Sequence, residues 1–260
     1  MEKINLGLQI HAVREAFDED PVKTFEKIAA MGYEGVELNL GTLKQEPQFY
    51  ADALDHLGLK CFSAMCGWAH MAEENLDSTI SLAKGLGITD LIIGSVDGNL
   101  LKNDPAYPGL AIAHMNDLVE RLGAEGIRTG YHSHDMDSFR VEPGKSFYEK
   151  VMENTPQNFC MVVDTGNTMG GGDDPIALLK QFPGRSPILH IKGYSQAKDY
   201  TTPVWESETD WDELLTTALD KCGTKTMVIE FGKRGDYEPF DRAEKSLVWL
   251  KETLTRLGRI

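Results

Sequence analysis

Eight times along this 260-residue chain, a short apolar run whose residues favour β-strands is followed by a longer amphipathic segment. The eight runs are residues 4–10, 35–40, 59–65, 90–94, 127–132, 159–164, 187–192 and 225–230. Their starts lie on average about 31 residues apart, which is the size of one βα unit. Strands that alternate with helices in this way pair in parallel and are joined by right-handed crossovers.

The segments between the apolar runs have the periodicity of amphipathic helices. In residues 21–31, Phe25 and Ile28 fall on one helical face. Asp20 is placed to act as the N-cap of this helix, and Gly32 is placed to end it. The other predicted helices cover residues 76–86, 109–124, 174–182, 211–221 and 241–257.

Two architectures accommodate eight such units, an open doubly wound sheet and a closed (β/α)8 barrel. Eight units in 260 residues fit the barrel well. The first apolar run is not followed by the Gly-x-Gly-x-x-Gly fingerprint of a dinucleotide-binding sheet. Nothing in the composition marks a linker. We therefore predict an α/β fold in which residues 1–260 form a single (β/α)8 barrel domain.

Charge and composition exclude several classes of partner. The chain has 26 Lys and Arg against 41 Asp and Glu, a net charge of −15, so phosphate backbones and anionic membrane surfaces are not expected to bind it. No stretch approaches the roughly 18 uninterrupted apolar residues of a membrane span. The N-terminal sequence lacks the features of a secretory signal, and the four cysteines form no Cys-x-x-Cys pair. We expect a cytoplasmic protein with reduced thiols.

Polar residues stand at the ends of the last four apolar runs. These residues are His132, Asp164, His190 and Glu230. The carboxyl ends of the strands carry the active site of a (β/α)8 barrel, and the alternation of side chains along each strand points all four into its mouth. Converging carboxylate and imidazole groups are costly to bury without a partner. The pattern predicts one divalent metal ion, for which nitrogen and oxygen donors suit Mn, Co, Zn, Fe or Mg.

The motifs that carry these residues resemble those of the xylose isomerase-like TIM barrels, a sugar isomerase/epimerase superfamily that also contains inosose dehydratase and endonuclease IV. The similar phrases are GYHSHD, VVDTGN, GGGDDPIALL, ILHIKGY, PVWESETDW and TMVIE. They occur in the family's order and span nearly the whole chain. By position, the family's metal ligands match His132, Asp164, His190 and Glu230.

One position departs from the epimerase branch of that family. The branch has a glutamate as the ligand of the fifth strand, whereas this chain has His132 in a Tyr-His-x-His phrase similar to that of the inosose dehydratase branch. The resemblance leaves open whether His132 or His134 is the ligand on this strand.

The resemblance implies a divalent-metal-dependent sugar isomerase or epimerase that acts through an enediolate on a keto-sugar or keto-polyol. The alternative is a lyase or dehydratase of an inosose or a 3-keto-glycoside. A third reading is an inactive sugar-binding barrel, against which the intact metal set argues. Glu230 is the candidate base, His134 or His132 a second acid or base, and Lys192 a donor to the developing oxyanion. For Lys192, a salt bridge at the rim is an equally common role.

Other residues are candidates for contacts with the substrate. The predicted substrate-binding residues are Glu37, Arg14, Trp68, Trp205, Glu206 and Asn167. The two tryptophans can stack on a sugar face, although packing is as common a role, and the charged residues can instead form ion pairs. The expected partner is a small sugar or polyol. Whether the chain forms a homo-oligomer is left open.

Overall fold

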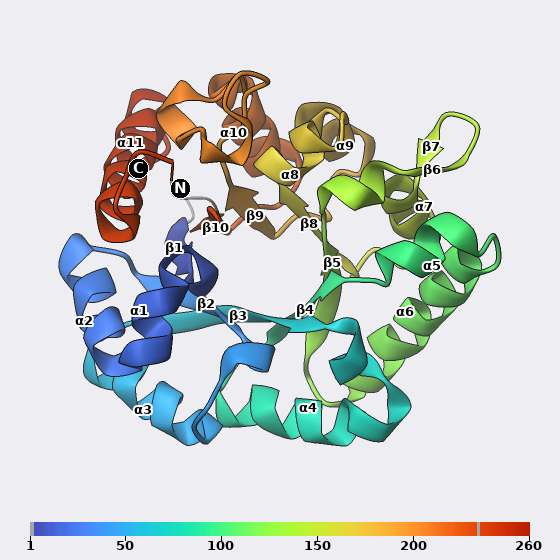
Figure 1. Ribbon diagram of the computed structural model, residues 1–260, viewed down its shortest axis with the longest axis horizontal. Coiled ribbons are helices and arrows are strands. Elements are labelled where there is room, and N and C mark those ends of the chain that lie inside the picture. The colour runs from blue at the N-terminus through green and yellow to red at the C-terminus, as the bar shows by residue number, and fades with distance from the viewer. Residues whose placement is uncertain (1–2, 233–234) are drawn as a thin grey trace.

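The computed structural model describes residues 3–232 and 235–260. Within them, eight parallel strands form a closed barrel with helices around it, as Figure 1 shows. Neighbouring strands follow one another in chain order, and β10 pairs with β1 to close the ring. This confirms the predicted (β/α)8 barrel. The barrel strands are β1 (Asn5–Gln9), β2 (Gly35–Asn39), β3 (Lys60–Gly67), β4 (Asp90–Ser95), β5 (Arg128–His132), β8 (Cys160–Asp164), β9 (Ile188–Ile191) and β10 (Thr226–Ile229).

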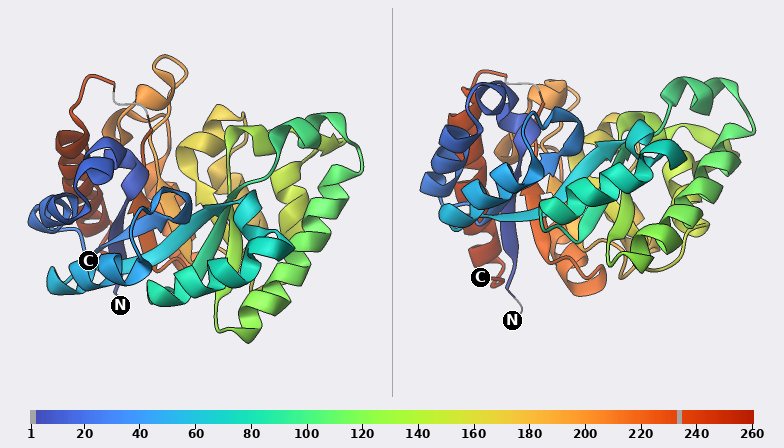
Figure 2. Two further views of the ribbon diagram at one scale, coloured as in Figure 1. Left: turned by 60° about the horizontal axis from the view of Figure 1, so that its bottom comes forward. Right: turned by 90° about the horizontal axis from the view of Figure 1, so that it is seen from below.

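The helices fall into two groups. The outer ring consists of α2 (Pro21–Met31), α3 (Pro47–His56), α4 (Glu73–Gly85), α6 (Tyr107–Ala124), α7 (Phe147–Glu153), α9 (Pro175–Gln181), α10 (Trp211–Lys221) and α11 (Pro239–Arg256). Shorter helices follow the carboxyl ends of strands, namely α1 (Arg14–Glu19), α5 (Gly98–Asn103) and α8 (Thr165–Gly170). A small antiparallel hairpin consists of β6 (Arg140–Glu142) and β7 (Lys145–Ser146). In side view, α5 and the loop after β9 project at the end of the barrel opposite to the C-terminus (Figure 2).

Local sequence explains most of these boundaries. Helix α2 begins as predicted, with the Asp20 side chain accepting a hydrogen bond from the amide of Lys23, and it ends at Gly32, whose φ of 86° suits glycine. The predictions missed α3 and α7 of the outer ring and the short helices α1, α5 and α8. Helix α3 buries only Tyr50 and Leu54 fully, so its apolar face is too sparse to show a helical period.

The interior of the barrel is filled. A separate cluster of buried side chains occupies its middle: Met65, Ile92, Cys160, Val162, Ile188 and Val228. Nearer the amino ends of the strands, the ring of Phe62 takes the space beside Gly7 and Gly35, where an added Cβ would lie 3.0 Å and 2.7 Å from that ring. Polar side chains at the carboxyl ends therefore rest on an apolar plug.

Replacing Gly130 by alanine is expected to lower the free energy of unfolding by about 3 kcal/mol. Gly130 lies on β5 against β8, and an added Cβ would lie 2.3 Å from the carbonyl oxygen of Cys160 and 2.4 Å from its Cβ. Urea denaturation measures the effect. The control is Gly123→Ala on α6, where an added Cβ meets nothing within 4 Å and should stabilise the helix slightly. Equal stability of the Gly130→Ala variant and the wild type would contradict the prediction.

Across residues 3–232 and 235–260, no helix combines the length and the apolar composition that crossing a membrane requires.

Candidate metal centre

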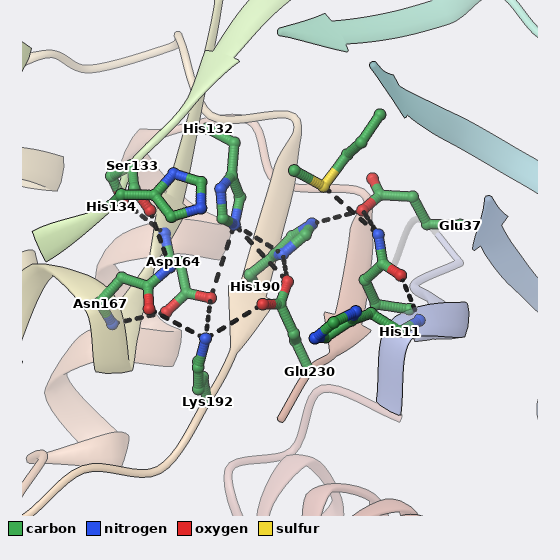
Figure 3. Close-up of polar contacts among 12 residues, drawn as sticks. His11, Glu37, His132, Ser133, His134, Asp164, Asn167, His190, Lys192 and Glu230 are labelled. Atoms are coloured by element: carbon green, nitrogen blue, oxygen red, sulfur yellow. Dashed lines mark hydrogen bonds and ion pairs between the residues drawn. The ribbon is translucent and has the colours of Figure 1, made fainter. Parts of the chain in front are cut away.

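The carboxyl ends of β5, β8, β9 and β10 bring four ionisable side chains together, as predicted from the strand ends (Figure 3). They are His132, Asp164, His190 and Glu230. One nitrogen or oxygen atom from each lies within 4.8 Å of the others. The exposed fractions of these residues range from 0% to 8%, so the group is nearly removed from water.

The four facing atoms form a compact set. Nε2 of His132 lies 3.5 Å from Oδ2 of Asp164 and 3.6 Å from Oε2 of Glu230. Nδ1 of His190 lies 2.7 Å from the same oxygen of Glu230 and 3.1 Å from Nε2 of His132. The two imidazole nitrogens and two carboxylate oxygens thus face a common point.

One of these atoms shows that the set fits a cation. Oδ2 of Asp164 is buried and accepts no hydrogen bond from any residue in the described part of the chain. A buried carboxylate oxygen without a donor is costly, and a bound cation would remove that cost. Two nitrogen and two oxygen donors suit Mn, Fe, Co or Zn, whereas Mg prefers oxygen alone. The four residues can therefore hold a divalent ion.

The structure also distinguishes the two histidines of the Tyr-His-x-His phrase. His132 directs Nε2 toward Asp164 and Glu230. His134 lies beside it, with ring centroids 4.8 Å apart and planes at 73°. Nδ1 of His134 is buried and makes no hydrogen bond within residues 3–232 and 235–260. The geometry thus places His132 in the ligand set and His134 next to it.

The buried ionisable side chains of this group shift one another's pKa values. Burial would raise the pKa of Glu230, but Lys192 and the two histidines outweigh it and hold this pKa well below its usual range. Burial would likewise lower the pKa of His190, but Glu37 and Glu230 raise it to about 10. Burial and the neighbouring His132 lower the pKa of His134 to about 4. Glu230 is therefore ionised and His134 neutral at pH 7.

Lys192 lies at the edge of the centre and brings a positive charge to it. Nζ of Lys192 donates to Oε1 of Glu230 at 3.0 Å and to Oδ1 of Asn167 at 2.9 Å, and it lies 3.6 Å from Oδ2 of Asp164. Gly166 leaves room for its stem, because a Cβ there would lie 2.8 Å from Cγ of Lys192. The ring of Tyr200 lies over the amine, with 5.5 Å between Nζ and the ring centroid.

Asn167 and Glu37, both predicted to bind substrate, lie within this group. The backbone amide of Asn167 donates to Oδ1 of Asp164 at 2.7 Å, and its side-chain amide donates to the carbonyl of Ser133 at 3.0 Å. Glu37 is fully buried on β2, with Oε1 at 3.0 Å from Nε2 of His190. Asn167 therefore holds Asp164 in place, and Glu37 lies behind His190.

The aromatic candidates have other partners. Trp68 packs edge-on against His114 of α6, with ring centroids 5.2 Å apart. Trp205 packs in the same way against Tyr237, at 5.4 Å. Their contact with a sugar stays a prediction.

The two remaining charged candidates lie on the surface. Glu206 is exposed and forms an ion pair with Lys198. Nε of Arg14 lies 3.6 Å from Oδ2 of Asp18. Arg14 also lines a cavity of about 430 Å³ that includes Phe231, the residue after Glu230. A role in substrate binding remains a prediction for both.

Three residues of the site escaped the sequence-based predictions. Gln9 and Ser63 hydrogen-bond Glu37, and Tyr200 covers Lys192. Gln9 ends β1 on the same alternation that selected the metal ligands, so its strand phase could have found it. Tyr200 lies in a three-residue 3₁₀ helix, Asp199–Thr201, which is too short to show a period.

Asp137 is expected to make the stability of the protein depend on pH. It is fully buried after β5, where its carboxylate accepts hydrogen bonds from the hydroxyl of Tyr131 and the amide of His134, both at 2.7 Å. Burial raises the pKa of Asp137 to about 7. Because the folded state then holds a proton that the unfolded state releases near pH 4, stability falls as the pH rises from about 4 through 7, by up to about 4 kcal/mol.

The Asp137→Asn variant isolates this effect. Urea denaturation of both proteins at pH 5, 6, 7 and 8 gives the difference in unfolding free energy. That difference is expected to shift steadily in favour of the variant as the pH rises, because an amide does not ionise. A difference that stays constant from pH 5 to 8 would show that the Asp137 carboxyl is ionised throughout.

The sequence of this chain is similar to a known protein family and to curated relatives. Residues 25–253 match the family model described as xylose isomerase-like TIM barrel. Inosose dehydratase 2 of Bacillus cereus is 27% identical over 110 residues, which are 40% of this chain and 36% of that protein. The matched segment thus spans little more than a third of this curated relative.

Two solved structures show the same architecture. A sugar phosphate isomerase/epimerase from Parabacteroides distasonis ATCC 8503 superposes with a TM-score of 0.77 at 19% identity, covering 96% of this chain and 94% of that one. The IolI protein with a bound zinc atom superposes with a TM-score of 0.69 at 13% identity, covering 98% of this chain and 99% of that one. At such identities the likeness shows the fold alone.

Proposed function

This chain belongs to the xylose isomerase-like TIM barrel family, and we propose that it is a divalent-metal-dependent isomerase or epimerase of a keto-sugar or keto-polyol. The observation that carries the proposal is the buried group of two imidazoles and two carboxylates with Lys192 at its edge. Such a group places a metal site, a base and a hydrogen-bond donor directly beside one another.

The four ligands would hold the ion through the atoms that face one another. A divalent ion there supplies Lewis acidity toward the carbonyl and hydroxyl oxygens of a polyhydroxylated substrate. The ligand residues contribute two negative charges, from Asp164 and Glu230, and the apolar layer beneath them excludes water from below. The same set can therefore orient a substrate that approaches from the mouth.

Proton transfer is assigned to Glu230. Oε2 of this residue faces the other ligands, whereas Oε1 faces Nζ of Lys192 at 3.0 Å. Glu230 removes a proton from the carbon next to the carbonyl, and Lys192 donates a hydrogen bond to the oxygen that becomes negative. Protonation of that carbon on its opposite face, which needs a second proton donor besides Glu230, gives an epimer. Return of the proton to the neighbouring carbon gives an aldose–ketose isomer.

A second candidate function is elimination, by a lyase or dehydratase of an inosose or 3-keto-glycoside. The partial similarity to inosose dehydratase favours it. In this reaction Glu230 takes the proton next to the carbonyl, and the electron pair forms a carbon–carbon double bond. The β-oxygen leaves as water or as an alcohol with the proton that Glu230 has taken.

Incubation of the protein with keto-sugars, inososes and 3-keto-glycosides in D₂O, with Mn, Co or Zn added, tests both candidates. Deuterium at the carbon next to the carbonyl without loss of water supports isomerase or epimerase chemistry. A new ultraviolet-absorbing enone supports elimination. Binding of sugars with neither signal, from a preparation that carries metal, would overturn the enzymatic proposal and favour a sugar-binding barrel. Glu230→Gln, prepared in parallel, reports any background reaction.

A further inference from the structure

We propose that Glu37 is a positioning residue that makes His190 bind the metal ion through Nδ1 and thereby sets the metal affinity of the site. This inference rests on the proposed function, because it concerns the same centre. It assigns Glu37 a role behind a ligand in place of the predicted contact with substrate. The side chain is fully buried, so a substrate in the mouth cannot reach it without displacing His190.

The two nitrogens of the His190 ring face opposite groups (Figure 3). Nδ1 lies 2.7 Å from Oε2 of Glu230 and 3.1 Å from Nε2 of His132, within the ligand set. Nε2 lies 3.0 Å from Oε1 of Glu37. An imidazole binds a metal only through a nitrogen without a proton, so its single remaining proton must sit on the other nitrogen. Here that nitrogen is Nε2, which is buried and forms no hydrogen bond within the described residues, and Oε1 of Glu37, 3.0 Å away, is the acceptor placed to take its proton.

Glu37 is itself fixed from two sides. The Gln9 side-chain amide on β1 donates to Oε1 at 3.1 Å, and the Ser63 hydroxyl on β3 donates to Oε2 at 2.6 Å. Gln9 is held in turn, because its Oε1 accepts the amide of His11 at 2.7 Å. The carboxylate therefore cannot rotate away from His190, and strands β1 to β3 support a ligand that β9 supplies.

The sum of the charges in the buried group also indicates that Glu37 supports metal binding. A divalent ion and Lys192 bring three positive charges, and the ligands Asp164 and Glu230 bring two negative ones. The carboxylate of Glu37 supplies the third negative charge and makes the sum zero. Because an unbalanced charge in a buried group is costly, loss of the Glu37 charge should weaken the binding of the cation.

Calorimetric titration of the metal-free protein with zinc alone tests the affinity. In Glu37→Gln the dissociation constant for zinc is expected to rise about 10- to 100-fold. Asp137→Asn is the matched control, a second fully buried acid that bonds Tyr131 and the amide of His134 instead of His190, and its dissociation constant should equal that of the wild type. Melting curves of the metal-free variants show that each is folded. An unchanged dissociation constant in folded Glu37→Gln would overturn the proposal.

A second measurement needs no variant at Glu37. In zinc-loaded, ¹⁵N-labelled protein, long-range ¹H–¹⁵N spectra of the histidine rings should show His190 with zinc on Nδ1 and a proton on Nε2. His190→Gln identifies the signals. Zinc on Nε2 would overturn the proposal, and failure of the wild type to bind any of zinc, Mn and Co would overturn both proposals. If zinc binds as expected but no keto-sugar, inosose or 3-keto-glycoside reacts, only the proposed function fails.

Discussion

Replacing Glu230 by glutamine is expected to lower turnover of the substrate by about 10⁴-fold, the upper range for loss of a general base. The reason is that one side chain serves two purposes. Its Oε2 lies among the ligand atoms, 2.7 Å from Nδ1 of His190, and its Oε1 lies 3.0 Å from Nζ of Lys192. Glutamine preserves the shape, but it neither accepts the proton nor carries the charge that attracts the ion.

Metal binding should weaken in the same variant. If four ligands share the roughly 10–16 kcal/mol of a tight zinc site, one ligand contributes about 3 kcal/mol, or roughly 100-fold in the dissociation constant. Metal content after dialysis and calorimetry with zinc measure this loss. Asp164→Asn should lose metal to a similar extent while its Oδ1 still accepts the amide of Asn167 at the start of α8.

The control is Glu213→Gln, which removes a surface carboxylate that pairs with Lys180 and should change neither turnover nor metal content. Turnover of Glu230→Gln within tenfold of the wild type would refute the assignment of Glu230 as the base. Full metal content in both Glu230→Gln and Asp164→Asn would refute the metal centre itself.

Replacing Lys192 by methionine is expected to lower kcat by about 10² to 10³-fold, which is typical for loss of one donor to a developing oxyanion. Lys192 is 7% exposed, and its amine lies 3.0 Å from Glu230 and 3.6 Å from Asp164. Without this positive charge, the carboxylates of Glu230 and Asp164 no longer interact with Lys192 and are available to the metal ion alone. The dissociation constant for zinc is therefore expected to stay the same or to fall.

A fall in kcat without any loss of zinc affinity distinguishes a role of Lys192 in the reaction from a purely structural ion pair. A purely structural Lys192 would lower the melting temperature of the variant and leave kcat unchanged, which would contradict the prediction. Gly166→Ala is an independent variant, because its Cβ would lie 2.8 Å from Cγ of Lys192 and displace the amine without removing it. It should lower kcat in the same direction. Lys180→Met, on the surface, is the control for loss of a lysine.

The architecture and the ligand set could be predicted because both follow from local periods. Alternation of apolar runs and amphipathic segments leaves only parallel α/β folds, and the number of units indicates the barrel. His132, Asp164 and Glu230 each end a run in the phase that points inward, so the carboxyl ends of the strands had to bring their side chains to one mouth. Helix α3 was missed because few of its residues are buried. Helix α7 was missed although Ser146 and Glu149 form a capping box at its start, a signal that the sequence contains.

The contacts between strands distant in the sequence were decided by the closed barrel alone. The register that pairs β1 with β10 brings Glu37 and Gln9 from the first strands to His190 near the end of the chain. The same closure selects His132 over His134, because only the former directs a nitrogen toward Asp164 and Glu230. It also places Tyr200, from the short 3₁₀ helix Asp199–Thr201, over the amine of Lys192. Sequence alone determined which residues face inward, since that depends on the alternation within one strand, whereas the partner of each residue depends on distances across the barrel.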